Sequence, residues 1–94
     1  SANIQGRYPL SIAAAMGDEA LVRLLLFWGA DVCARDDMGR TALHRAAGCG
    51  MAGVVKLLLE KGADREVADY TGRTALGWAD KENVKELLLR EQSV

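Results

Sequence analysis

The side chains able to do covalent chemistry are few in this chain, and they lie too far apart in the sequence to suggest a catalytic set. His44 is the only histidine, and the two cysteines are Cys33 and Cys49. Nucleophilic catalysis requires a base within reach of an activated serine or cysteine, together with a group that orients the base. No such trio is visible around His44, so we expect a chain with no catalytic residues that is not an enzyme.

Metal and cofactor sites are equally hard to build from these residues. A zinc site needs several Cys or His ligands, and one histidine without a close Cys pair does not supply them. Cys49 has no basic neighbour in the sequence that would activate it, so we interpret it as a plain thiol. The glycines form no phosphate-binding motif. We therefore expect no metal and no cofactor.

Composition limits the protein class and its partners. The chain has 94 residues, of which 50% are hydrophobic and only 5% aromatic, which suits one domain of thin, closely packed helices. The formal net charge is −1 with no basic block, which argues against nucleic acid. The longest apolar run, Ala20 to Ala30, is too short to span a bilayer, so no membrane association is expected. The sparse cysteines favour reduced thiols in an intracellular protein, with the cytoplasm expected and the nucleus left open.

A repeated pattern organises the whole chain. The segment from Gly6 to Leu10 recurs from Gly39 to Leu43 and from Gly72 to Leu76, and the two offsets (39 − 6 and 72 − 39) are both 33 residues. A constant period in the range of about 20–50 residues indicates a stacked repeat protein, whose units bury their apolar faces against one another. We expect one domain over 1–94, with repeats at about 3–35, 36–68 and 69–94.

The middle repeat predicts a turn followed by two helices. The turn is expected around Asp36 to Gly39, with Thr41 as the N-cap of a short first helix over 42–47. A second helix is expected over about 52–61, with Gly62 as a left-handed C-cap.

The outer repeats vary this plan. Pro9 fits the first position of a helix. The third repeat lacks three residues between its helices, which predicts a first helix that stops near Ala79 or Asp80. Its polar second helix is typical of a terminal capping unit.

These landmarks resemble the ankyrin repeat. The run Gly39 to Ala47, the apolar run Val54 to Leu59 and the Gly62-Ala63-Asp64 triplet match its 33-residue period and its T-P-L-H-x-A signature, over essentially the whole chain. The resemblance implies an all-α solenoid of three helix-turn-helix units with short β-turn or hairpin fingers. It also implies that His44 is structural, tying the Thr41 region to a neighbouring loop.

The resemblance further implies a protein-protein interaction module that binds an unknown protein partner through finger tips and inner helices. The expected partner-binding positions are Ile4, Gln5, Arg7, Met16, Arg35, Asp37, Met38, Arg40, Arg45, Cys49, Tyr70, Thr71, Arg73 and Trp78. Arg7, Arg40 and Arg73 are equivalent, and either they form a ladder for an acidic partner or their stems pack on neighbouring turns. An alternative function is a structural or regulatory segment of a larger protein that packs on its own neighbouring domains.

Phe27 and Trp28 stand where the other repeats carry charged residues. The interpretation that we favour is that one ring folds back over the Gly29 loop while the other is half covered. Alternatives are packing against a missing neighbouring repeat, and contact with a partner or a second copy. The N-terminal face of the first repeat raises the same question, because Ile12, Leu21 and Leu24 have no evident polar cap before them.

Overall fold

The protein is described here from a computed structural model, which describes residues 9–89. Six helices within that range form three antiparallel pairs: α1 (Pro9–Met16) with α2 (Glu19–Phe27), α3 (Ala42–Gly48) with α4 (Ala52–Glu60), and α5 (Ala75–Trp78) with α6 (Glu82–Leu89). Residues 9–89 contain no β-strand. The expected all-α fold is therefore confirmed, and Pro9 occupies the first helical position as predicted.

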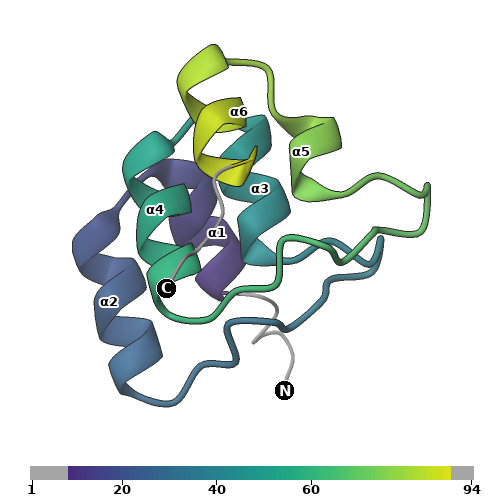
Figure 1. Cartoon of the computed structure of the whole chain (residues 1–94). Helices are drawn as coiled ribbons and strands as arrows, with labels where there is room; N and C mark the ends of the chain where they lie inside the picture. The colour runs from purple at the N-terminus through teal and green to yellow at the C-terminus, as the bar shows by residue number, and fades with distance from the viewer. Residues whose placement is uncertain (1–8, 90–94) are drawn as a thin grey trace.

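The pairs stack into two rows of helices. The first helices pack in the order α1, α3, α5, and the second helices pack in the order α2, α4, α6 (Figure 1). The segments that join one pair to the next run away from the helices and turn back at the right of Figure 1. These turns are the expected fingers, and we name them finger 2 (residues 36–40) and finger 3 (residues 69–73).

Small residues allow the first row to pack closely. Ala13 and Ala14 of α1 are fully buried, as are the equivalent Ala46 and Ala47 of α3. An alanine adds little width to a helix, so adjacent first helices can approach one another more closely than leucine-lined helices could. The first row adds Leu10 and Leu43 to the core, and the second row supplies most of its larger apolar groups: Val22, Val54, Val55, Leu57, Leu58, Val84 and Leu88.

The first helices differ in how they begin. Thr41 caps α3 through a capping box, in which its hydroxyl accepts from the His44 amide while the His44 ring accepts from the Thr41 amide. Thr74 makes no such side-chain bond at α5, where Gly77 stands in place of the histidine. The helix α5 ends at Trp78 with Ala79 as its C-cap, close to the predicted end of the shortened helix.

Candidate interaction surface

Each finger is closed by one aspartate. The Asp36 Oδ1 accepts from the backbone amides of Met38 and Arg40 at 2.9 and 2.8 Å. The Asp69 Oδ1 accepts in the same way from the amides of Thr71 and Arg73, at 2.9 and 3.0 Å. Because each carboxylate bonds amides two and four residues further on, it fixes the shape of its turn.

Glycine completes both turns. Gly39 and Gly72 have φ of 78° and 87°, in the left-handed region that favours glycine. The equivalent fingers therefore share one backbone shape, which explains why a glycine recurs at this position of the repeat.

Asp69 has further partners that Asp36 lacks. It also accepts from the Thr71 hydroxyl at 2.7 Å and from the indole nitrogen of Trp78 at 2.8 Å. The Thr71 hydroxyl, with the Trp78 and backbone donors, holds the pKa of Asp69 well below its usual range. Asp69 is thus a buried carboxylate that fixes both the backbone of finger 3 and the Trp78 ring of α5.

The two fingers contact each other directly. The Tyr70 amide donates to the Met38 carbonyl oxygen at 3.0 Å, and the Arg35 guanidinium donates to the Ala68 carbonyl oxygen at 3.0 Å. The Tyr70 ring lies so close to Gly39 that a Cβ at that glycine would be 2.6 Å from Tyr70 Cδ1. Finger 3 is therefore stacked on finger 2.

His44 joins the second repeat to the third, as predicted. Its Nδ1 accepts from the Thr41 amide at 3.1 Å, and its Nε2 lies 3.0 Å from the Arg73 carbonyl oxygen. Because an amide can only donate, Nδ1 must be the acceptor, so Nε2 carries the proton and donates to Arg73. Both ring nitrogens are occupied, which leaves neither available as a base.

An aromatic ring of α5 and one arginine from each finger lie close together. The guanidinium carbons of Arg40 and Arg73 lie 5.8 and 5.5 Å from the centre of the Trp78 ring. These distances are within the range of about 6 Å at which a cation is attracted to an aromatic face. The Arg40 Nε also forms an ion pair with Asp36 at 3.0 Å.

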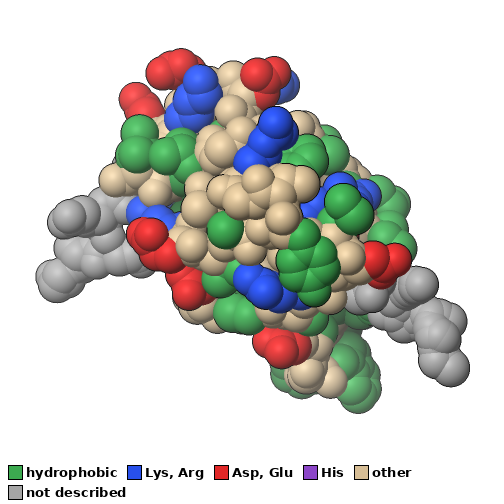
Figure 2. Space-filling model, turned by 90° about the vertical axis from the view of Figure 1, so that its right-hand side faces the viewer, with side chains coloured by type: hydrophobic (Ala, Val, Ile, Leu, Met, Phe, Trp, Pro, Cys, Tyr) green, Lys and Arg blue, Asp and Glu red, His purple; other side chains and the backbone are tan. Residues whose placement is uncertain are grey.

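We define the finger surface as the cluster that these contacts bring together: Met38, Arg40, Tyr70, Arg73 and Trp78. Figure 2 faces this side of the molecule and shows basic side chains among apolar ones, with acidic side chains toward the margins. Met38, Tyr70 and Arg73 are exposed, whereas Arg40 and Trp78 are partly buried. These five residues form one continuous candidate site.

The remaining predicted positions fall into three groups. Ile4, Gln5 and Arg7 lie outside the described residues, so the expected three-arginine ladder can be followed only at Arg40 and Arg73. Arg35, Asp37 and Thr71 lie in or beside the fingers, and Arg35 and Thr71 each donate to a neighbouring oxygen there. Met16 is the last residue of α1, Arg45 lies within α3, and Cys49 is the C-cap of α3. Met16 and Cys49 therefore lie at the helix ends away from the fingers.

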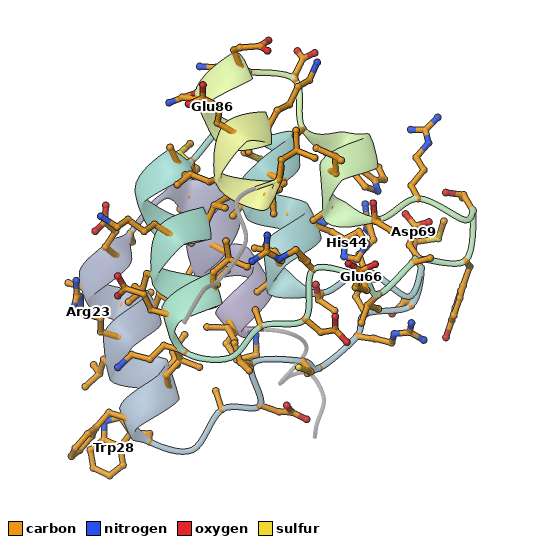
Figure 3. All side chains as sticks on the ribbon, viewed as in Figure 1. Arg23, Trp28, His44, Glu66, Asp69 and Glu86 are labelled. Carbon is orange, nitrogen blue, oxygen red and sulfur yellow. The ribbon has the colours of Figure 1, made fainter. Side chains whose placement is uncertain are left out.

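Phe27 and Trp28 do not fold back over the loop, so the interpretation we favoured from the sequence is wrong. Their side chains are 80% and 75% exposed, and their rings contact each other edge to face with centres 5.8 Å apart. Trp28 lies at the C-terminal end of α2, across the molecule from His44 and Asp69 (Figure 3). The hollow beside the pair is lined by Ala20, Arg23, Leu24, Leu26, Phe27 and Lys61.

The sequence reasoning missed two features of the finger surface. Asp69 was not singled out, although it lies 33 residues after Asp36 (69 − 36) and could have been found from that spacing. The hydrogen bond between Asp69 and Trp78 had no such signal, because neither other repeat has a tryptophan at the equivalent position.

Stacked helix pairs with finger turns define a helical-repeat protein, and comparison with known proteins gives its family. The family model for ankyrin repeats, in three copies, matches residues 10–94. The chain belongs to the ankyrin-repeat family.

Several ion channels contain a segment similar to this chain. Transient receptor potential cation channel subfamily V member 5 of Mus musculus and member 6 of Rattus norvegicus are each 54% identical over 36 residues. Member 6 of Homo sapiens is 51% identical over the same length. The matched segment is 38% of this chain and 5% of each channel, so the similarity concerns a small part of those proteins.

Two features are absent from residues 9–89. No group of three or more His, Cys, Asp or Glu side chains among them is arranged to hold a metal ion. None of the helices in the described part of the chain has the length and apolar character needed to cross a membrane.

Proposed function

We propose that this chain recognises a partner protein through the finger surface, as part of an intracellular protein and without catalysis. Ankyrin repeats generally mediate protein-protein interaction, and the chain belongs to that family. The proposal also treats the three repeats as one domain over 1–94.

One observation carries the proposal. The finger surface combines exposed Tyr, Arg and Met side chains with a backbone that is already fixed by Asp36, Asp69 and the contact between fingers. Tyr and Arg are enriched among the residues that dominate binding energy at protein interfaces. A surface fixed before binding loses less conformational entropy when the partner docks.

Affinity capture from a cell lysate tests this proposal. The wild-type chain is compared with a finger variant (Met38→Asp with Arg73→Glu) and with a control variant on the other side of the molecule (Phe27→Ser with Trp28→Ser). These variants replace exposed side chains and are first matched for thermal unfolding. We expect proteins retained by the wild type and the control to be lost from the finger variant; equal retention by the finger variant would contradict the proposal.

A second candidate function is supported by the N-terminal face. Leu24 of α2 is 50% exposed, whereas the equivalent Leu57 of α4 is only 3% exposed. Leu57 lies in a helix that has α2 on one side and α6 on the other. The exposed Leu24, Phe27 and Trp28 would fit a chain that packs on a neighbouring repeat or domain, or on a second copy. Loss of captured proteins only from the Phe27 and Trp28 variant would favour this candidate.

A further inference from the structure

We propose that the partner segment recognised by the finger surface is acidic, and that one of its carboxylates is bound by Arg73 beside the Trp78 ring. This inference rests on the proposed function and adds the chemistry of the partner. It is supported by the hydrogen bonds and ion pairs that the charged groups around Trp78 form, and by those that Arg73 does not form.

Arg73 is the cation of this cluster whose guanidinium is available to bind a carboxylate of the partner. Its side chain is exposed, and among residues 9–89 its guanidinium makes no hydrogen bond or ion pair, only the contact with the Trp78 ring. A guanidinium has five N–H donors in a planar fork that matches a carboxylate. Arg73 can therefore donate two parallel hydrogen bonds to one carboxylate without giving up an existing hydrogen bond of its side chain.

The nearby carboxylates Asp36 and Asp69 form no ion pair with Arg73. Asp69 accepts from two backbone amides, the Thr71 hydroxyl and the Trp78 indole, so its oxygens are already occupied. Asp36 is bound to two amides and to the Arg40 Nε. Asp36 and Asp69 are thus both used within the fingers, while the Arg73 side chain forms no ion pair among residues 9–89.

Trp78 keeps the arginine in place. The indole nitrogen donates to Asp69 at 2.8 Å, which fixes the ring, and the ring in turn contacts Arg73 and Arg40. Holding a guanidinium on an aromatic face lowers the number of conformations that it loses on binding an anion. Arg40 adds a second positive charge on the same ring, with part of its fork directed to Asp36.

The neighbouring side chains indicate the rest of the ligand. Met38 and Tyr70 are both exposed large apolar residues of the two fingers, and the backbones of these two residues are joined by a hydrogen bond. A flexible thioether and an aromatic ring are well suited to contact an apolar side chain. We therefore infer a short segment with an acidic residue next to an apolar one.

Two-dimensional NMR of the 94-residue chain tests this inference. The probe is the acetylated and amidated tripeptide Glu-Leu-Glu, with Gln-Leu-Gln as the matched uncharged peptide. We expect Glu-Leu-Glu to shift the Trp78 indole N–H and the Arg73 Nε–H resonances, with a dissociation constant on the order of millimolar for so small a ligand. Gln-Leu-Gln should leave both in place.

The controls lie in the chain itself. Trp28 carries the other indole and should not respond, and Trp28→Phe assigns the two signals. Arg73→Gln should raise the dissociation constant for Glu-Leu-Glu by about three- to tenfold. Arg23→Gln, which replaces an exposed arginine of α2, should leave that constant unchanged. Equal responses to both peptides, a response that survives Arg73→Gln, or no response at Trp78 would each overturn the inference.

The lysate experiment separates this inference from the function on which it rests. If the finger variant loses captured proteins but the acidic peptide leaves Trp78 unchanged, the recognition function stands and the acidic partner is wrong. If the finger variant retains every captured protein, the recognition function itself fails.

Discussion

His44 links two repeats at the scale of single hydrogen bonds. It is 1% exposed and satisfies the Thr41 amide of its own repeat and the Arg73 carbonyl oxygen of the next. This histidine therefore connects α3 to finger 3 through hydrogen bonds. The same ring fixes the backbone of Arg73, the residue that we propose binds the partner.

The first prediction is that His44→Ala destabilises the chain by about 1–3 kcal/mol, because it leaves the buried Thr41 amide without an acceptor and removes one of the two donors to the Arg73 carbonyl oxygen. Urea unfolding followed by circular dichroism measures the change. Arg45→Ala, at the next and only partly buried position of the same helix, is the control and should have a much smaller effect. An unchanged unfolding midpoint for His44→Ala would show that the two hydrogen bonds add nothing to stability.

The second prediction concerns acid. The hydrogen bonds to Asp69 lower its pKa in the folded state below the value of about 3.9 found in unfolded chains. The stability that this carboxylate contributes is therefore present above about pH 4 and is lost as the pH falls toward the folded pKa. Unfolding measured from pH 7 to pH 2 should show a shallower loss for Asp69→Asn than for the wild type. Parallel curves would mean that Asp69 is not a source of the acid sensitivity.

At the scale of elements, regular features of the repeat were predictable and specific contacts were not. The sequence pattern predicted the helix of 42–47, the cap at Thr41 and the positive φ at Gly62, because each depends on a few adjacent residues. The packing of Tyr70 on Gly39 was not predictable. It depends on how finger 3 stacks on finger 2, which no local spacing specifies.

The exposure of Phe27 and Trp28 was misjudged for the same reason. Whether a ring at a helix end folds back or stays in solvent depends on the neighbouring helices, and no described element covers this end of α2 (Figure 3).

The third prediction compares two equivalent glycines. Gly72→Ala should cost about 1 kcal/mol, because alanine disfavours a positive φ but meets no atom within 4 Å. Gly39→Ala should cost about 2–3 kcal/mol, since its methyl group also collides with the Tyr70 ring. Adding Tyr70→Ala should reduce the Gly39→Ala cost to that of Gly72→Ala. Equal costs in the wild-type background would contradict the stacking of the fingers.

At the scale of the whole molecule, the stack is asymmetric. The outer helix of the third repeat carries polar residues, whereas the first repeat leaves Leu24, Phe27 and Trp28 exposed. In a repeat array, internal units bury apolar faces against their neighbours, whereas terminal units have polar outer faces. The exposed apolar end of the first repeat is therefore typical of an internal unit. A partner can bind the fingers whether or not this apolar end is covered, because the two surfaces lie on opposite sides of the molecule.

The fourth prediction uses equivalent leucines to test that asymmetry. Leu57→Ala should cost about 2–5 kcal/mol, as expected for a buried leucine. Leu24→Ala should cost less than about 1 kcal/mol, because half of that side chain is already in solvent. Both are measured by chemical unfolding at several protein concentrations. Similar costs for the two would contradict the half-exposed position of Leu24, and a Leu24→Ala cost that grows with concentration would show that a second copy covers the N-terminal face.

Site-specific photocrosslinking in cells tests most directly the central claim, that the finger surface binds a partner protein. A benzophenone amino acid replaces Met38 in one variant and Phe27 in another, so each side of the molecule carries one probe at an exposed position. We predict a discrete crosslinked product with another protein at position 38 that disappears when Arg73→Glu is added. Crosslinks only at position 27, or none at position 38, would contradict the account.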